Sequence, residues 1–277
     1  MGKVCLQNLG MIITERCNLN CGHCLRGGCS NKVMSDEVIE ATLDQVCAIG
    51  CLSICGGEPL LALDRIEKIF TSIIEKEIVI DKVAVAINGT IYEKDFLDML
   101  DFINEYIVNF DGRHIYLDIS NDIYHKREIE RLGLKEQYFE NVRKYSKSPH
   151  FYEMRQLSRK LFREGNAQNL DLDLTVPLRP MNTVLTYTSE NKLNKIRYFN
   201  KKRLGLCNIG PLVTVNVNGT ITECDASIEN QETVYNYGNV LIDSIEDVCL
   251  NRGEVIMPVE WYRTTGQIMK RYGTYNK

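Results

Sequence analysis

The chain lacks the marks of secreted, membrane-spanning or nucleic-acid-binding proteins. No apolar run in its 277 residues approaches the roughly 20 residues that a membrane-spanning helix needs. The first residues, Met1–Cys5, are not followed by the long apolar segment of a secretory signal, which predicts a cytoplasmic protein. The formal net charge is only −4, so the charge balance favours neither nucleic acid nor an anionic membrane as a partner.

Cysteines are abundant, in contrast, and they are unevenly placed. Eight of the eleven lie before residue 56 and three lie after residue 206. Such clustering fits metal ligation in a reducing compartment better than a disulfide framework. Cys17, Cys21 and Cys24 form the pattern C-x3-C-x2-C. Three thiolates can hold three corners of a four-iron cluster and leave the fourth iron open to a small molecule.

Two other interpretations fit this spacing. The three positions could lie on one face of a helix, but Asn18, Asn20 and Gly22 between them favour turns and predict a tight loop. Zinc also binds clustered thiolates, although a structural zinc site usually has a fourth ligand. His23 lies between two of the cysteines and is badly placed to be that ligand.

A second motif follows about thirty residues later. The apolar segment 52–55 runs into Gly56, Gly57 and Glu58. Two glycines let the backbone approach a ligand closely, and a carboxylate can accept hydrogen bonds from a ligand ammonium group. Alone, this motif would be an ordinary turn. Because it follows the cysteine loop, it is a second signal that is independent of the cysteine spacing.

Together the two motifs resemble the radical S-adenosylmethionine (SAM) superfamily. The resemblance implies an enzyme with a 4Fe-4S cluster and S-adenosyl-L-methionine as cofactors. It implies that the cluster is held by Cys17, Cys21 and Cys24, and that the methionine end of SAM lies against Gly56, Gly57 and Glu58.

Weaker matches follow two predicted strands. The resemblance implies that Asn88, in Asn88-Gly89-Thr90, and Ser120 reach the ribose or carboxylate of SAM. A plain turn and a helix cap are the alternatives. His23 is expected to tune the potential of the cluster.

The implied chemistry needs a partner. A one-electron donor such as flavodoxin or ferredoxin reduces the cluster, and SAM is then cleaved to a 5'-deoxyadenosyl radical that takes a hydrogen atom from the substrate. The protein positions the cofactor against the substrate and excludes water.

Strand and helix signals alternate after the cysteine loop. Strands are predicted at 52–55, 83–87, 115–119 and 170–176. Helices are predicted from Ser35 to Gly50, through 66–73, around 96–106, and once or twice between 125 and 164. This alternation predicts an α/β fold with a parallel sheet and its sites at the carboxyl ends of the strands. The family resemblance implies a partial (β/α)6 TIM-like barrel over residues 1–205.

Residues 206–277 are predicted to form a small extension. Apolar and polar residues alternate over 212–223 around Asn218-Gly219, a strong hairpin signal. The spacing Cys207-x11-Gly219-x4-Cys224 is similar to the opening of SPASM and twitch domains, as are residues 238–240 and the helix signal that follows.

The extension also departs from that pattern. A full SPASM domain has a further run of close cysteines, whereas only Cys249 follows Cys224. Cys207 and Cys224 could hold an auxiliary iron-sulfur cluster that another residue or the substrate completes. Alternatively, the hairpin holds no cluster and packs over the barrel mouth.

The substrate class rests on this C-terminal resemblance, which favours a peptide or protein side chain. Cys17 comes so early that we expect the barrel itself or a separate protein to recognise a peptide. A small molecule, such as a sugar, amino acid or nucleotide, is the alternative among enzymes. A non-catalytic iron-sulfur or zinc sensor or scaffold is the alternative from another class, and it has no use for the Gly-Gly-Glu motif. RNA modification is disfavoured by the acidic balance.

Overall fold

The computed structural model of the chain describes residues 3–107, 114–147, 152–157, 161–162, 165–170, 175–176, 186–187, 193–195, 212–222 and 236–251. Its main sheet has the order β13-β12-β11-β1-β2-β4-β5-β6, with β3 paired to β2. Neighbours from β1 to β6 are parallel, as are β1 and β11. The strands of the sheet are β1 (Val4–Thr14), β2 (Val46–Gly56), β3 (Val79–Ile80), β4 (Val83–Ile87), β5 (Ile115–Ser120), β6 (Tyr152–Leu157), β11 (Leu212–Val215), β12 (Thr220–Thr222) and β13 (Gly238–Asn239).

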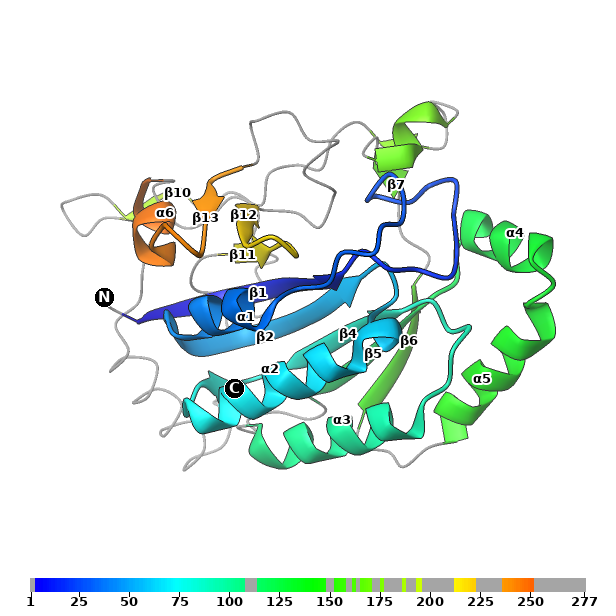
Figure 1. Cartoon of the computed structure of the whole chain (residues 1–277), viewed down its shortest axis with the longest axis horizontal. Coiled ribbons are helices and arrows are strands. Elements are labelled where there is room, and N and C mark those ends of the chain that lie inside the picture. Colours follow the sequence, from blue (N-terminus) through cyan, green and yellow to red (C-terminus); the bar gives the residue numbers. More distant parts are fainter. Residues whose placement is uncertain are drawn as a thin grey trace.

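Helices connect the successive parallel strands of this sheet. They are α1 (Asp36–Leu43), α2 (Leu63–Glu75), α3 (Lys94–Tyr106), α4 (Ile123–Arg131) and α5 (Lys135–Lys147). Figure 1 shows α2, α3 and α5 along the same side of the sheet. The predicted α/β class, with helices linking parallel strands in the order of a partial barrel, is confirmed. No helix in the described part of the chain has the length and apolarity needed to cross a membrane.

Short elements complete the fold. They are the 3-10 helices η1 (Pro59–Ala62) and η2 (Gly165–Asn169), the strand pair β7 (Leu161–Phe162) and β8 (Thr175–Val176), and the pair β9 (Thr186–Tyr187) and β10 (Leu193–Lys195).

The two faces of the sheet differ in chemistry. On β5, Ile115, Leu117 and Ile119 are fully buried in the hydrophobic core. The alternate residue Asp118 lies on the opposite face, where it accepts two hydrogen bonds from the Arg155 guanidinium of β6, over 2.6 and 2.8 Å. The period of two along the strand thus separates an apolar face from a polar one.

One predicted helix boundary is wrong. The helical pattern was expected to run to Gly50, but α1 ends at Leu43 and β2 already begins at Val46. The first five residues of β2 are all buried. A strand covered on both faces reads as a continuous apolar run, and such a run also satisfies helical spacing.

One further prediction is wrong between residues 150 and 176, and another is confirmed in part. The expected helical region up to 164 contains the strand β6, which pairs in parallel with β5. Of the expected strand 170–176, residues 171–174 lie outside the described residues, and Thr175–Val176 is a strand that pairs with β7 outside the main sheet. Leu170 instead follows the 3-10 helix η2.

The C-terminal hairpin is confirmed. β11 and β12 are antiparallel, and Gly219 in the turn has a φ of +85°. β11 pairs with residues 8–11 of β1, so the hairpin extends the sheet at its edge. The helix α6 (Ile245–Asn251) follows β13, as predicted. The boundary predicted at residue 205 lies outside the described residues.

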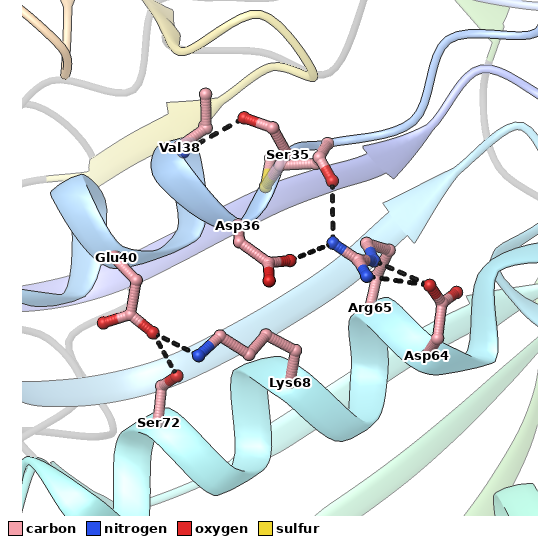
Figure 2. Close-up of polar contacts among 9 residues, drawn as sticks. Ser35, Asp36, Val38, Glu40, Asp64, Arg65, Lys68 and Ser72 are labelled. Carbon is pink, nitrogen blue, oxygen red and sulfur yellow. Dashed lines mark hydrogen bonds and ion pairs between the residues drawn. The ribbon is translucent and has the colours of Figure 1, made fainter.

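The helices α1 and α2 meet through charged side chains, drawn in Figure 2. Glu40 of α1 binds Lys68 over 2.6 Å and accepts a hydrogen bond from Ser72 over 2.8 Å. Arg65 of α2 pairs with both Asp36 and Asp64. The α1–α2 contact is therefore polar and partly open to solvent.

Candidate functional site

The three cysteines lie on the loop between β1 and α1. Its backbone turns twice, because Cys24 N–H donates to the Cys21 carbonyl and Gly27 N–H donates to the Cys24 carbonyl, each over 3.1 Å. Glu15 N–H donates to the Lys32 carbonyl over 2.9 Å and closes the base of the loop. The predicted loop is confirmed, and the helical alternative is wrong.

The thiols on this loop are partly buried and act on one another. Burial is the largest cause that raises the pKa of Cys17 to about 12, and the field of Cys24 adds to it. Burial also raises the pKa of Cys21, followed by the fields of Cys17 and Cys24. A thiolate is the form that ligates metal. Ionising Cys17 and Cys21 here therefore needs a cation nearby.

A four-iron cluster fits this set of donors. Within the described ranges, no three Cys, His, Asp or Glu side chains lie close enough together to share a single metal ion. A 4Fe-4S cluster does not require three side chains to converge on one ion, because each cysteine binds its own iron. The positive charge of the irons offsets both the burial and the mutual repulsion of the thiolates.

The Gly-Gly-Glu turn at the end of β2 packs on the cysteine loop. Gly57 N–H donates to the Thr14 carbonyl, and Glu58 N–H donates to the Arg16 carbonyl, each over 2.7 Å. A Cβ on Gly56 would lie 2.6 Å from the Thr14 oxygen, and one on Gly57 would lie 2.2 Å from the Arg16 oxygen. Both glycines are thus required by the close approach of the loop backbone, a reason that the sequence did not give.

Glu58 joins this turn to the end of β4. Its side chain is fully buried, and its two oxygens accept hydrogen bonds from Leu60 N–H over 3.0 Å and Asn88 N–H over 2.7 Å. Burial raises the pKa of Glu58 to about 7, although both hydrogen bonds lower it. A nearby ligand ammonium would favour the ionised form.

Asn88 connects β4 to the cysteine loop. Its Nδ2 donates to Asn18 Oδ1 over 2.8 Å and lies 3.9 Å from Cys17 Sγ. Its Oδ1 accepts hydrogen bonds from the Thr90 amide over 2.8 Å and the Thr90 hydroxyl over 2.7 Å. The Asn-Gly-Thr motif therefore lies beside the first cysteine, and its contact with SAM stays a prediction.

Ser120 is the last residue of β5, one strand beyond Asn88. Its carbonyl accepts a hydrogen bond from the Tyr138 hydroxyl over 2.9 Å. Among the residues that the structure describes, its own hydroxyl has no hydrogen-bond partner. The contact of Ser120 with SAM stays a prediction.

His23 faces α4. Its Nε2 lies 3.1 Å from Asp122 Oδ2, and its ring stacks on Tyr124 with 5.4 Å between centroids. Asp122 also caps α4, because its Oδ1 accepts hydrogen bonds from two amides of the first turn. One turn later, Glu128 Oε1 accepts a hydrogen bond from Asn20 N–H over 3.0 Å. The helix α4 thus contacts the cysteine loop through two acidic side chains.

Arg26 links the cysteine loop to the end of β2. Its Nε donates to the Gly56 carbonyl over 2.7 Å, and its guanidinium lies 3.9 Å from Cys55 Sγ. Asn166 N–H of η2 donates to the Cys24 carbonyl over 2.8 Å. Sequence reasoning missed Arg26, Asp122 and Glu128, whose partners lie far away along the chain.

The predicted auxiliary cluster is not tested by the described residues. Cys207 and Cys224 lie outside the described residues, so their cluster stays a prediction. Cys249, the remaining C-terminal cysteine, is fully buried in α6 against the hydrophobic core.

The chain was compared with curated proteins, solved structures and protein-family models. No curated protein sequence matches it. Among solved structures, native anSMEcpe with bound AdoMet and Cp18Cys peptide is 15% identical with a TM-score of 0.48, and the match covers 87% of this chain and 80% of that one. Streptococcus suis SuiB bound to the precursor peptide SuiA is 14% identical with a TM-score of 0.44, covering 88% and 64%.

The family comparison is more specific. The model of the Radical SAM superfamily matches residues 11–150, half of the chain. The matched range contains the cysteine loop, the Gly-Gly-Glu turn, and the carboxyl ends of β4 and β5. The chain therefore belongs to the radical SAM superfamily.

Proposed function

We propose that this protein is a radical SAM enzyme that modifies a peptide or protein side chain. The observation that carries the proposal is the convergence of separate motifs at one edge of the sheet. The cysteine loop after β1, the Gly-Gly-Glu turn after β2 and Asn88 after β4 are joined by direct hydrogen bonds. Carboxyl ends of parallel strands are where α/β folds place their ligand sites.

The residues at this edge of the sheet have different proposed roles. Cys17, Cys21 and Cys24 would hold the 4Fe-4S cluster, and Glu58 and Asn88 fix the loop that carries them. When bound, the cluster and SAM supply one-electron cleavage of SAM and a 5'-deoxyadenosyl radical that takes a hydrogen atom from the substrate. Ser120 offers a hydroxyl to SAM from the next strand.

The peptide substrate is supported by the C-terminal pattern. The hairpin around Asn218-Gly219 and the segment from Gly238 into α6 have the order found in SPASM and twitch extensions. An auxiliary cluster on Cys207 and Cys224 belongs to the same proposal. A cytoplasmic location stays a prediction from the sequence.

A small molecule is the second candidate substrate, and the polar face of the sheet favours it. Asp118 fixes the Arg155 guanidinium, which also lies 4.3 Å over the Tyr116 ring. The Arg155 side chain is 37% exposed. A positioned guanidinium with donors left over can bind a carboxylate or phosphate of a small substrate.

The test is formation of 5'-deoxyadenosine from SAM by anaerobically reconstituted protein with dithionite as reductant. Wild type should form it, whereas Cys17→Ala should lose at least 100-fold in rate together with part of its iron. Cys51→Ala, a cysteine of β2 outside the loop, is the matched control and should keep both. Peptide and small-molecule pools then identify the substrate class through increased turnover.

The outcomes separate the enzyme from the non-catalytic alternative. Iron bound through Cys17 without 5'-deoxyadenosine, under any reductant or substrate pool, would contradict the proposal and favour an iron-sulfur sensor or scaffold. Stoichiometric zinc in place of iron in protein purified without air would favour the zinc alternative.

A further inference from the structure

The outer face of α4 combines an exposed apolar side chain with cations that have no acidic partner. Ile123 is 56% exposed, and Lys126 and Arg127 are both exposed beside it. Within the described part of the chain, neither cation is paired with a carboxylate. The third cation of the helix, Arg131, is paired with Glu128. This outer face, Ile123, Lys126 and Arg127, is therefore locally positive on a chain of net charge −4.

The same helix is in direct contact with the cysteine loop. Asp122 binds His23, which stands between Cys21 and Cys24 in the sequence. The Arg127 guanidinium lies 5.5 Å from the centre of the Tyr124 ring, and Tyr124 stacks on His23. A continuous stack of planar groups thus runs from an exposed cation to the segment that carries the cluster ligands.

Two other charged surfaces, that of α2 and the groove between α2 and α3, are unsuitable for an acidic protein. The cations of α2 are already paired with acids, Arg65 with Asp36 and Asp64, and Lys68 with Glu40. Between α2 and α3 lies a groove of about 400 Å³, and its charged lining is acidic: Glu67, Asp95 and Asp98. Like charges would repel an acidic partner from this groove.

We propose that the outer face of α4 is the docking site of an acidic electron-carrier protein of the flavodoxin or ferredoxin class. The proposal rests on the proposed function, which needs one electron for each cleavage of SAM. The reduced carrier would lose one electron, a 4Fe-4S cluster held by Cys17, Cys21 and Cys24 would gain it, and no bond would form or break in this step. The rate of electron transfer falls steeply with the distance between donor and acceptor. A carrier must therefore dock beside the cysteine loop.

The expected interface is small and governed by charge. Electron-transfer complexes bury less than about 1,200 Å² and dissociate readily. Opposite charge raises the association rate by about 10-fold to 1,000-fold at low salt, and an exposed apolar residue beside the cations supplies the close contact. Ile123, one helical turn before Lys126 and Arg127, matches this description.

The test uses the double charge reversal Lys126→Glu with Arg127→Glu. The matched control is Arg143→Glu with Lys144→Glu, two adjacent exposed cations on α5 with the same total change in charge. Formation of 5'-deoxyadenosine is measured with dithionite and, separately, with flavodoxin kept reduced. We expect the α4 variant to keep its dithionite-driven rate and to lose at least tenfold in its flavodoxin-driven rate at low ionic strength. The control variant should change both rates less than twofold.

A binding measurement completes the test, because it does not depend on turnover. Oxidised flavodoxin is titrated onto each immobilised variant at low and high salt. Binding that is at least tenfold weaker for the α4 variant alone, with the difference shrinking in salt, supports the proposal. Equal affinities of the two variants would overturn it. If wild type forms no 5'-deoxyadenosine even with dithionite, the proposed function fails, and the affinities alone still decide the docking site.

Discussion

The carboxyl edge of the sheet and the α1–α2 contact are both built from charged and polar side chains, yet they are held in opposite ways. At the edge, Glu58 is fully buried and both of its partners are main-chain amides. Between α1 and α2, Glu40 is one third exposed, and its partners are the side chains of Lys68 and Ser72 (Figure 2), together with that of Lys76.

The difference teaches where this molecule can tolerate change. A buried polar group with fixed partners leaves them unsatisfied when it is removed, at a cost of about 1–3 kcal/mol for each group. An exposed ion pair exchanges its partner for water, and its contribution is about 0–1 kcal/mol. Substitutions at the sheet edge should therefore disturb both folding and cofactor binding, whereas those between α1 and α2 should change stability slightly.

The largest effect is expected from Gly57→Ala. The new Cβ would meet the Arg16 carbonyl oxygen at 2.2 Å, and a backbone atom cannot move aside as a flexible side chain can. The cysteine loop must shift, so we expect a loss of about 3 kcal/mol or more in the free energy of unfolding. Denaturant unfolding of the apoprotein and iron content after reconstitution measure the two consequences.

Gly28→Ala is the matched control for this substitution. Gly28 lies on the same loop, and a Cβ there meets nothing within 4 Å. We expect unchanged iron content and a change in stability below about 1 kcal/mol. Similar losses in the two variants would show that the loop is not held by its packing on the Gly-Gly-Glu turn.

An intermediate effect is expected from Glu58→Gln. The amide keeps the shape of the side chain but can accept through only one atom, so one of the two main-chain N–H groups loses its bond. We expect a loss of about 1–3 kcal/mol near pH 7. SAM binding, followed by equilibrium dialysis, should weaken at least fivefold, whereas iron content should stay intact.

The pH dependence of stability tests whether Glu58 is a buried carboxyl group with a raised pKa or only fills space in the core. Its folded pKa is raised to about 7 from 4.5, so the stabilisation from its protonated form is complete below 4.5 and is lost as pH rises through about 7. Wild type should therefore lose stability relative to Glu58→Gln between pH 4.5 and 7, by about 1.4 kcal/mol for each pH unit at most. Parallel stability curves across this window would contradict the assignment.

Sequence reasoning succeeded where neighbouring residues carry the signal. The cysteine spacing, the Gly-Gly-Glu turn and Asn88-Gly89-Thr90 are each local motifs, and the structure joins all three at one edge. The contacts between them could not be predicted, because Asn20 and Glu128 are 108 residues apart in the chain. Asp122 could have been noticed as a helix cap, but not as the partner of His23.

The error at the end of α1 has a physical cause. β2 is buried on both faces along its first half, so its apolar run from Val46 imitates the helix before it. The place of the hairpin was also beyond prediction, because the pairing of β11 with β1 joins residues about two hundred positions apart. Local patterns predict elements well, whereas sheet order depends on tertiary contacts.

The smallest effect is expected from Glu40→Gln, at the α1–α2 contact. Hydrogen bonds from Lys68 and Lys76 hold the folded pKa of Glu40 at about 2, below its usual 4.5. Its contribution is thus present above pH 4.5 and is lost as pH falls through about 2. We expect the variant to unfold at most about 1 kcal/mol more easily at pH 7, with the difference shrinking in high salt and vanishing near pH 2. Glu37→Gln, an exposed acid on the same helix without an ion pair among the described residues, is the control for thermal unfolding across this range. A difference above 2 kcal/mol in the free energy of unfolding that survives in 1 M salt would contradict the contrast with the sheet edge. It would show that an exposed ion pair here contributes as much to folding as a buried carboxylate.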